Sequence, residues 1–453
     1  MGATLDRRRF LSAACAATLS GRAQTRRRRP NFIILFADDM GYGDLACYGH
    51  PTLRTPNLDR MAEEGARLTS FYSAAPVCTP SRVGLLTGRY PVRAGQPNNL
   101  GPDSVGGLRL TEKTIAQVLK EQGYRTAAIG KWHLGHNPPE YLPTARGFDS
   151  YLGLLYSNDM IPPFVKTEKP LELFRDARAI EPMTDQSGLT ERYTAEAIRF
   201  IRSAGTNPFF LYLPYAMPHL PISASSRKGT SRAGLYGDVI ETLDWSAGEI
   251  LRTLREQGVD GDTMVVFTSD NGPWNNLPPR MLQKGNQPWH TGTKNLLRGA
   301  KGTTWEGGQR VPCIVRWPGV IPGRQAPADM ASTLDLFATL ASAAGAALPS
   351  DRVYDSYDLM PFLKGEAPSP RREFFYFRGR TLEAVREGKW KFRHAREVRG
   401  EGQPGGDLRM ELFDLDTDPA EQYDQYPAQR PLGDRLHARL KAFAEELKAD
   451  LPG

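Results

Sequence analysis

From residue 31 onward, short runs of apolar residues alternate with longer segments in which apolar residues recur every three or four positions. The runs have the length and continuity of strands buried on both faces, and the longer segments have the spacing of amphipathic helices. Strands that alternate with helices in this way favour an α/β fold, in which helices cover a mostly parallel sheet. The strands are expected at 32–36, 125–129, 208–213 and 263–268, and the helices at 111–122, 190–203 and 235–257.

The pattern changes after about residue 363, where the apolar runs become shorter and follow one another closely. Such runs indicate an antiparallel sheet, and a final segment with helical spacing closes it. The charged, glycine-rich segment 393–409 is expected to be a surface loop. The strands are expected at 373–377, 382–386, 389–392 and 412–415, and the helix at 430–449. We therefore predict a leader at 1–29, a main domain at 30–363 and a C-terminal α+β subdomain at 364–453.

Polar residues stand after each predicted strand of the main domain. In open α/β sheets, ligands bind outside the carboxyl ends of the strands. We therefore expect these polar residues to form one composite site. They are Asp38 and Asp39, Lys131 and His133, His219, and Asp270 and Asn271.

The stretch 77–89 contains Cys78, Pro80 two residues later and Arg82 four residues later. Proline is tolerated in the first turn of a helix, so Cys78 would lie at a helix N-terminus with Arg82 one turn further on the same face. The positive end of a helix dipole suits a tetrahedral anion, which predicts anion chemistry. A thiolate phosphatase loop is an alternative, but it needs a longer spacing between cysteine and arginine to wrap a phosphate. Only three residues separate Cys78 from Arg82, which disfavours this alternative. A buried structural cysteine is the remaining alternative.

Two of the strand ends offer only oxygen ligands, from Asp38, Asp39, Asp270 and Asn271. Such ligands suit a hard cation such as Ca²⁺ or Mg²⁺, whereas cysteine and histidine would suit zinc. Adjacent carboxylates repel each other, and a divalent cation is a reason to place Asp38 beside Asp39. The alternative is two solvated loop acids and a separate Asp–Asn turn.

The formal net charge of +7 is concentrated at the N-terminus, where residues 1–29 hold eight arginines and one acid. The rest of the chain has equal numbers of basic and acidic residues, so binding to nucleic acid is not expected. No apolar run is long enough to span a membrane, and no stable membrane insertion is expected. Four cysteines, one of them Cys15, do not make a disulfide framework.

The leader contains three arginines at 7–9, followed by Phe10, Leu11 and a weakly apolar run of small residues. Paired arginines before Phe-Leu resemble a twin-arginine export signal, which carries folded proteins across a bacterial inner membrane. The sequence therefore predicts an exported, periplasmic protein. A plain basic tail is the alternative.

Two motifs resemble signatures of the formylglycine-dependent sulfatases. Residues 78–82 read Cys-Thr-Pro-Ser-Arg and are followed at 86–89 by Leu-Thr-Gly-Arg, as in the first signature of that family. Residues 123–133 resemble the second signature over their whole length. The resemblance runs from about residue 31 to 424, and it implies an alkaline-phosphatase-like fold. That fold has a large mixed, mostly parallel sheet flanked by helices, with a smaller C-terminal antiparallel sheet.

The resemblance implies an arylsulfatase-type enzyme that hydrolyses sulfate monoesters of small aryl or saccharide substrates. In the family, a formylglycine-generating enzyme oxidises the cysteine, here Cys78, to an aldehyde, and the hydrate of that aldehyde is the nucleophile. The converted residue also contributes to a Ca²⁺ site. The metal ligands implied by the resemblance are Asp38, Asp39, Cys78, Asp270 and Asn271.

The same resemblance implies catalytic roles for Cys78, Arg82, Lys131, His133, His219 and Lys301. Among these residues, Lys131, His219 and Lys301 are expected to bind the substrate. Ser157 resembles a serine that lies near the sulfate in some arylsulfatases. Without the resemblance, a Lys-x-His loop or a lone loop histidine is typical of exposed or structural residues.

Two other functions remain open at this stage. A phosphonate or phosphate monoester hydrolase would use the same nucleophile, and a noncatalytic sulfated-glycan binding protein would share the fold. The segment 274–295 matches no part of the family pattern, so it leaves the substrate open. Within it, Trp289 and His290 are candidates for the substrate entrance. The acids at 414, 416 and 418 have the initial spacing of an EF-hand, but Pro419 stands in place of its glycine, which predicts a structural turn.

Overall fold

The computed structural model describes residues 29–399 and 403–449 of the 453-residue chain. Nine strands form the main sheet, in which the strands from β11 to β7 are parallel and those at both edges are antiparallel. In sheet order they are β2 (Ala66–Leu68), β12 (Cys313–Arg316), β11 (Thr263–Ser269), β1 (Asn31–Ala37), β10 (Phe209–Pro214), β5 (Arg125–Ile129), β7 (Ser150–Leu154), β8 (Glu172–Arg175) and β9 (Arg178–Pro182). The predicted leader lies outside the described residues, apart from Arg29.

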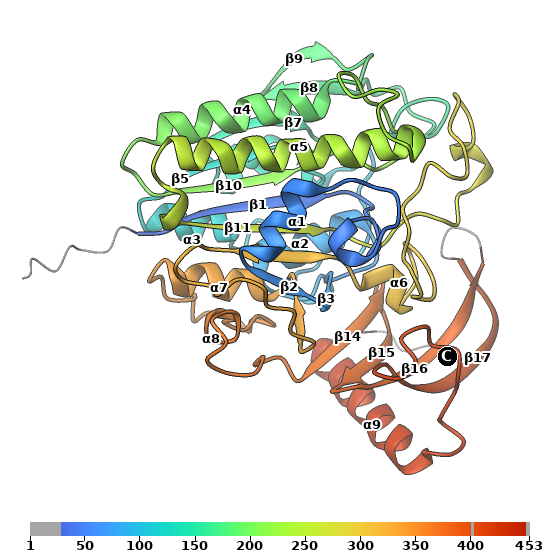
Figure 1. The fold of residues 1–453 in the computed structure, drawn as a ribbon. Coiled ribbons are helices and arrows are strands. Elements are labelled where there is room, and N and C mark those ends of the chain that lie inside the picture. The colour runs from blue at the N-terminus through green and yellow to red at the C-terminus, as the bar shows by residue number, and fades with distance from the viewer. Residues whose placement is uncertain (1–28, 400–402, 450–453) are drawn as a thin grey trace, which may run out of the picture.

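Helices cover both faces of the parallel strands (Figure 1). On one face α4 and α5 lie side by side, and on the other α2, α3 and α7 pack together. The strands between them are apolar on both faces, and every residue of β1 is buried. The helices are α1 (Pro56–Glu63), α2 (Cys78–Thr87), α3 (Ile115–Glu121), α4 (Leu189–Ala204), α5 (Gly234–Glu256), α6 (Glu306–Gln309), α7 (Asp335–Ala343) and α8 (Met360–Leu363). The predicted α/β class is therefore confirmed.

The predicted strands and helices of this part of the chain are all present, and one predicted boundary is wrong by more than one residue. Helix α3 begins at Ile115 rather than at residue 111. The side chain of Thr114 accepts the N–H of Gln117, and the Gln117 side chain accepts the N–H of Thr114. This capping box fixes the start of the helix.

A second sheet of four antiparallel strands follows in the C-terminal part, and α9 packs on it (Figure 1). The prediction of a surface loop at 393–409 is wrong, because the strands on either side of this segment continue into it as a long hairpin. Arg393 on one strand is buried and pairs with Glu411 on the other at 2.9 Å, so its charge does not require solvent. These elements are β14 (Glu373–Arg378), β15 (Thr381–Glu387), β16 (Trp390–Arg399), β17 (Gln403–Asp414) and α9 (Arg430–Leu447).

The remaining elements are short. They comprise β3 (Ser70–Tyr72), β4 (Gly106–Gly107), β6 (Gly135–Asn137) and β13 (Met330–Ser332), and the 3₁₀ turns at 46–48, 139–141, 143–146, 260–262 and 279–281. Asp418 accepts the backbone N–H groups of Gln422 and Tyr423 at 2.8 Å, which makes it part of a turn, as predicted. Among the described helices, none has the length and apolar character needed to cross a membrane.

Candidate active site

The parallel pairing of β1 with β11 brings the predicted acidic residues together. The last residues of these two strands are paired, so Asp38 and Asp39, which follow β1, meet Asp270 and Asn271, which follow β11. The backbone N–H of Asp39 donates to Asp270 Oδ1 at 3.0 Å. Asp39 has a φ of 65°, a conformation that non-glycine residues rarely adopt, and this hydrogen bond holds it there. All four side chains are buried.

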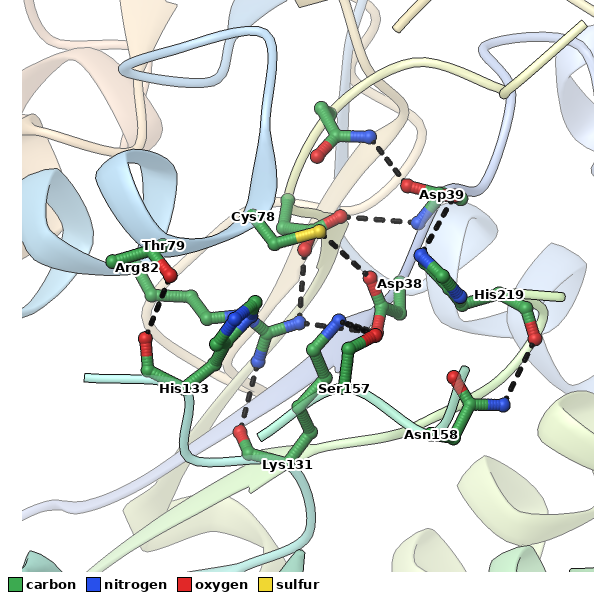
Figure 2. A network of polar contacts seen from close by, with 12 residues as sticks. Asp38, Asp39, Cys78, Thr79, Arg82, Lys131, His133, Ser157, Asn158 and His219 are labelled. Carbon is green, nitrogen blue, oxygen red and sulfur yellow. Dashed lines mark hydrogen bonds and ion pairs between the residues drawn. The ribbon is translucent and has the colours of Figure 1, made fainter. Parts of the chain in front are cut away.

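Helix α2 presents Cys78 and Arg82 to these acids on one face, as the spacing predicts (Figure 2). Cys78 is the first residue of the helix, and its Sγ lies 3.6 Å from Asp38 Oδ1. One turn later, Arg82 Nη2 lies 2.8 Å from Asp270 Oδ2 and 3.5 Å from Asp38 Oδ2. Arg82 Nη1 also donates to the carbonyl of Lys131 at 2.9 Å, which ties the helix to the loop after β5.

Two buried lysines complete the ring of cations around the acids. Lys131 Nζ lies 2.6 Å from Asp38 Oδ2 and donates to Ser157 Oγ at 2.9 Å. Lys301 Nζ lies 2.8 Å from the Asp39 carboxylate. Burial lowers the pKa of both ammonium groups, but the neighbouring carboxylates outweigh it and raise the pKa above the usual lysine value. Both lysines are therefore charged at neutral pH.

The three carboxylates differ in how readily they hold a negative charge. Burial raises the pKa of Asp270 to about 7, and the charge of Asp38 adds to this effect. Burial also raises the pKa of Asp39, and Lys301 only partly opposes it. For Asp38, burial is outweighed by Lys131 and Arg82, which hold its pKa well below the usual value. The raised pKa values of Asp39 and Asp270 indicate that the cations do not fully offset the burial of these two carboxylates, which favours a further positive charge beside them.

The donor set at the strand ends fits a hard divalent cation. Asn271 Oδ1 is buried and has no hydrogen-bond donor among the described residues, although Asn271 Nδ2 donates to Asp39 Oδ1 at 2.7 Å. A buried carbonyl oxygen without a donor costs about 1–3 kcal/mol, and coordination to a cation would remove that cost. The ligand atoms of Asp38, Asp39, Cys78 and His219 lie within 4.8 Å of one another. Asp38 and Asp39 together with Asp270 and Asn271 offer oxygen ligands, which suit Ca²⁺, whereas Cys78 and His219 by themselves would suit zinc.

The two predicted histidines are both buried, and each has a defined partner. His133 Nε2 lies 2.7 Å from the carbonyl of Leu100, and His219 Nδ1 lies 2.6 Å from the carbonyl of Leu220. A carbonyl can only accept, so each of these nitrogens carries a hydrogen, which leaves His219 Nε2 facing Asp39 at 3.5 Å. Burial, followed by the nearby lysine charges, lowers the pKa of both imidazoles well below the usual value. Both rings are therefore neutral in this site.

Unmodified Cys78 is poorly suited to act as a thiolate. Burial raises the pKa of its thiol well above the usual range, and the nearby lysines only partly oppose this. A protonated thiol is a weak nucleophile, because the thiolate is the reactive form. The thiolate alternative therefore conflicts with the surroundings of Cys78.

The site opens into a pocket of about 200 Å³ whose wall includes residues that the sequence did not predict. The indole of Trp274 contacts both the imidazole of His219, at 5.5 Å between ring centroids, and Lys301 Nζ, at 4.5 Å from its centroid. Trp274 comes three residues after Asn271, and that proximity was the available signal. The other unpredicted lining residues include Asn99, Asp159 and Arg280. Trp289 and His290, which were predicted to line the entrance, are not among the lining residues of this pocket, and Trp289 is 71% exposed.

Comparison with known proteins identifies the family to which the chain belongs. The sulfatase family model matches residues 30–346. The chain belongs to the sulfatase family. This sulfatase is 38% identical to arylsulfatase A of Homo sapiens, over 88% of this chain and 83% of the human protein. It is 41% identical to N-acetylgalactosamine-6-sulfatase of Rattus norvegicus, over 80% of this chain and 71% of the rat protein.

A solved structure agrees with this family assignment. The structure of Ps i-CgsB in complex with k-i-k-neocarrahexaose superposes on this sulfatase with a TM-score of 0.79 and 28% identity. The superposition covers 92% of this chain and 93% of the other. The predicted family, the alkaline-phosphatase-like fold and the enzyme class are therefore confirmed: the protein is an enzyme of a family that hydrolyses sulfate esters.

Proposed function

We propose that this sulfatase hydrolyses sulfate monoesters through a formylglycine hydrate derived from Cys78, with Ca²⁺ bound beside it. The ligands we propose for the ion are Asp38, Asp39, Asp270, Asn271 and the converted residue 78. The observation that carries the proposal is the position of the Cys78 Sγ, 3.6 Å from a buried carboxylate, at the edge of a cluster of oxygen donors and cations. The aldehyde hydrate supplies an oxygen nucleophile at a position where the thiolate is disfavoured.

The buried cations provide the charge that a sulfate group requires. When bound, Ca²⁺ would add positive charge beside the sulfate oxygens and hold the nucleophile in place. Three charged side chains of the site each pair with at least one carboxylate, which fixes their positions. They are Arg82, Lys131 and Lys301. Fixed charges of this kind stabilise the charge that develops as the ester bond breaks, without reorganising during the reaction.

Proton movements follow from the protonation states of the site. Asp270, whose charge acts on Cys78, can assist deprotonation of the nucleophile, and neutral His133 can act as a second base. Lys301 is protonated, and it can give its proton to the leaving oxygen once substrate binding weakens its pairing with Asp39, which holds its pKa above the usual value. His219 is neutral, so it serves as an acid only after it takes up a proton, and its Nε2 lies on the same side as Lys301, against Asp39. We therefore assign the proton transfer to the leaving group to Lys301 acting with His219.

The leaving group that we propose is a ring-bearing alcohol, either a sugar or a phenol. Two relatives support this choice of leaving group, because one is an arylsulfatase and the other is an N-acetylgalactosamine-6-sulfatase. A third support is the structure of Ps i-CgsB, which was solved in complex with k-i-k-neocarrahexaose. The indole of Trp274, which lies against Lys301 and Arg280, adds apolar surface to the wall of the pocket. Ser157, bound to Lys131, would lie beside the sulfate.

Replacing Trp274 with alanine is expected to raise KM for aryl and sugar sulfates by roughly tenfold, because the apolar wall that the indole provides is lost. The value of kcat should change less, since the indole does not move protons. Steady-state kinetics with one aryl sulfate and one sugar sulfate measure this split. Trp289→Ala is the matched control, because Trp289 is exposed and outside the pocket lining. An unchanged KM in Trp274→Ala would remove the indole from substrate binding.

Turnover of matched esters tests the choice of sulfate over other groups. An aryl sulfate is expected to be hydrolysed faster than the aryl phosphonate and aryl phosphate with the same phenol. A clear preference for the phosphonate or phosphate would replace our substrate assignment with the alternative hydrolase. Binding of a sulfated saccharide without any turnover would instead identify a noncatalytic binding protein.

Maturation completes the proposal. A formylglycine-generating enzyme would oxidise Cys78, and the arginine-rich leader would direct the folded protein to the periplasm by a twin-arginine route. Oxidation would then precede export, since that route carries folded chains. We also propose the division into a catalytic domain at 30–363 and a C-terminal subdomain at 364–453.

A further inference from the structure

The segment that carries Lys301 connects the active site with the C-terminal sheet. At one end, the N–H of Lys301 donates to the carbonyl of Pro273, and the N–H of Gly302 donates to that of Pro76, at 3.0 and 2.9 Å. Pro76 is two residues from Cys78, and Pro273 is two residues from Asn271. Residues 303–306 then lead into α6, which lies beside the C-terminal strands (Figure 1).

A buried charge cluster fixes the other end of this segment. Lys391 on β16 donates from Nζ to the carbonyl of Thr304 at 2.9 Å and to Glu306 Oε1 at 3.0 Å. The same Nζ lies 2.7 Å from Glu421 Oε1, and Glu421 Oε2 accepts the backbone N–H of Glu306 at 2.7 Å. Glu306, Lys391 and Glu421 are all fully buried. We call these three residues the Lys391 cluster.

Trp305 adds a second attachment to the same sheet. The guanidinium carbons of Arg298 and Arg393 lie 3.7 and 3.8 Å from the centroid of the Trp305 ring. Two guanidinium groups at that distance would overlap on one face, so they must cover opposite faces of the indole. Arg393 belongs to β16, and the ring of Phe413 on β17 packs against the indole with 5.8 Å between the ring centroids. These contacts hold Trp305 against the C-terminal sheet.

This arrangement contributes geometry more than stability. A buried ion pair gains little over well-packed apolar residues of the same volume, because removing its charges from water is costly. Its specific effect is to define one position for the groups that it joins. Here those groups are the carbonyl of Thr304 and the backbone N–H of Glu306, three and five residues from Lys301.

We propose that Lys391 is a positioning residue for Lys301, so that the C-terminal sheet sets the geometry of a cation in the active site. Lys391 does not line the pocket and acts through the backbone of residues 301–306. The inference rests on the proposed function in one respect, namely that Lys301 contacts the sulfate group.

A double-mutant cycle between Lys391 and Lys301 tests this inference. Lys391→Met keeps most of the side-chain volume and removes the donors to Thr304 and Glu306. In the full-length enzyme, it is expected to lower kcat/KM for an aryl sulfate by roughly 10- to 100-fold, as displacement of a catalytic group by about 1 Å does. In a Lys301→Met background the same change should cost less than about twofold, because the group being positioned is absent.

The same cycle is measured with inorganic sulfate by calorimetry in the presence of Ca²⁺, since sulfate binding requires neither turnover nor the aldehyde. If the wild-type enzyme fails to hydrolyse sulfate esters, the proposed function fails, and the sulfate cycle still decides the positioning role. If Lys391→Met does not fold, Trp305→Phe replaces it in the same double-mutant cycle. Glu373→Gln is the matched control, because Glu373 pairs with Arg439 of α9 and does not touch residues 301–306. It should leave both readouts unchanged.

A merely structural role gives a different result. Lys391→Met and Trp305→Phe would then lower the melting temperature and the folded fraction, but kcat/KM per folded enzyme would be unchanged. Equal losses of kcat/KM in the wild-type and Lys301→Met backgrounds would also overturn the inference, because Lys391 would then act independently of Lys301. A loss of kcat/KM that occurs only in the background that retains Lys301 supports the inference.

Discussion

Replacing Cys78 with alanine abolishes sulfate-ester hydrolysis, with kcat/KM expected to fall by roughly 10⁴-fold or more, as for the loss of other covalent nucleophiles. No other described nucleophilic side chain is held in the same position, 3.6 Å from Asp38 and at the start of α2. The remaining cations still bind sulfate. The KM for the sulfate ester and the inhibition constant of inorganic sulfate should therefore change far less than kcat. The loss is measured as the rate of aryl sulfate hydrolysis, which is monitored through the phenol that is released.

The matched control is Cys47→Ala, which removes a free cysteine that lies outside the pocket lining. This variant should retain the wild-type kcat and KM. Substantial hydrolysis by Cys78→Ala would show that the nucleophile lies elsewhere, and a comparable loss in Cys47→Ala would point to a general effect of cysteine removal on folding.

Removing divalent cations should lower activity by about three orders of magnitude, because the metal supplies several kcal/mol of charge stabilisation in such sites. Added Ca²⁺ should restore the activity, and restoration by Mg²⁺ alone would change the identity of the ion. Calcium should also raise the melting temperature, by binding to the folded state only; at 100 times its Kd it stabilises the fold by about 2.7 kcal/mol. Chelation followed by titration, with activity and thermal unfolding as readouts, measures both effects.

Asp39→Asn tests whether the strand-end residues hold the ion. It should weaken the calcium response strongly, since Asp39 lies between Asn271 and Lys301 in the cluster. Asp159→Asn serves as the control, because Asp159 is a buried carboxylate of the same pocket that lies outside the proposed ligand set. It should keep the wild-type calcium affinity. Full activity in the presence of a chelator would exclude a metal-dependent mechanism.

The strand ends were predictable because two local patterns and one general rule are sufficient. Apolar runs defined β1 and β11, polar residues followed each run, and parallel neighbours place their carboxyl ends at one edge. The helical spacing of Cys78 and Arg82 added the nucleophile position and one cation. The parts of the site that depend on regular elements could therefore be placed from sequence.

Several residues whose positions depend on loops or on distant contacts were not predicted, and the loop residues His219 and Lys301 were assigned to catalysis only through the resemblance to the family. Trp274 and Asp159 line the pocket from irregular segments, where sequence carries no periodic signal. Lys391 and Glu306 are separated by 85 positions, and only the packing of α6 against β16 brings them together. The hairpin at 393–409 was missed because its charge is typical of a solvent-exposed segment, whereas Arg393 pairs with Glu411 across the strands and lies on Trp305.

The central claim is that residue 78 acts as an aldehyde hydrate rather than as a thiol. Mass analysis of the peptide that contains residue 78, taken from active enzyme made in its native host, tests it most directly. We predict that the cysteine has lost its sulfur and that the peptide carries an aldehyde, while the peptides with Cys47 and Cys313 remain unmodified. An unmodified cysteine at position 78 in fully active enzyme would contradict the mechanism.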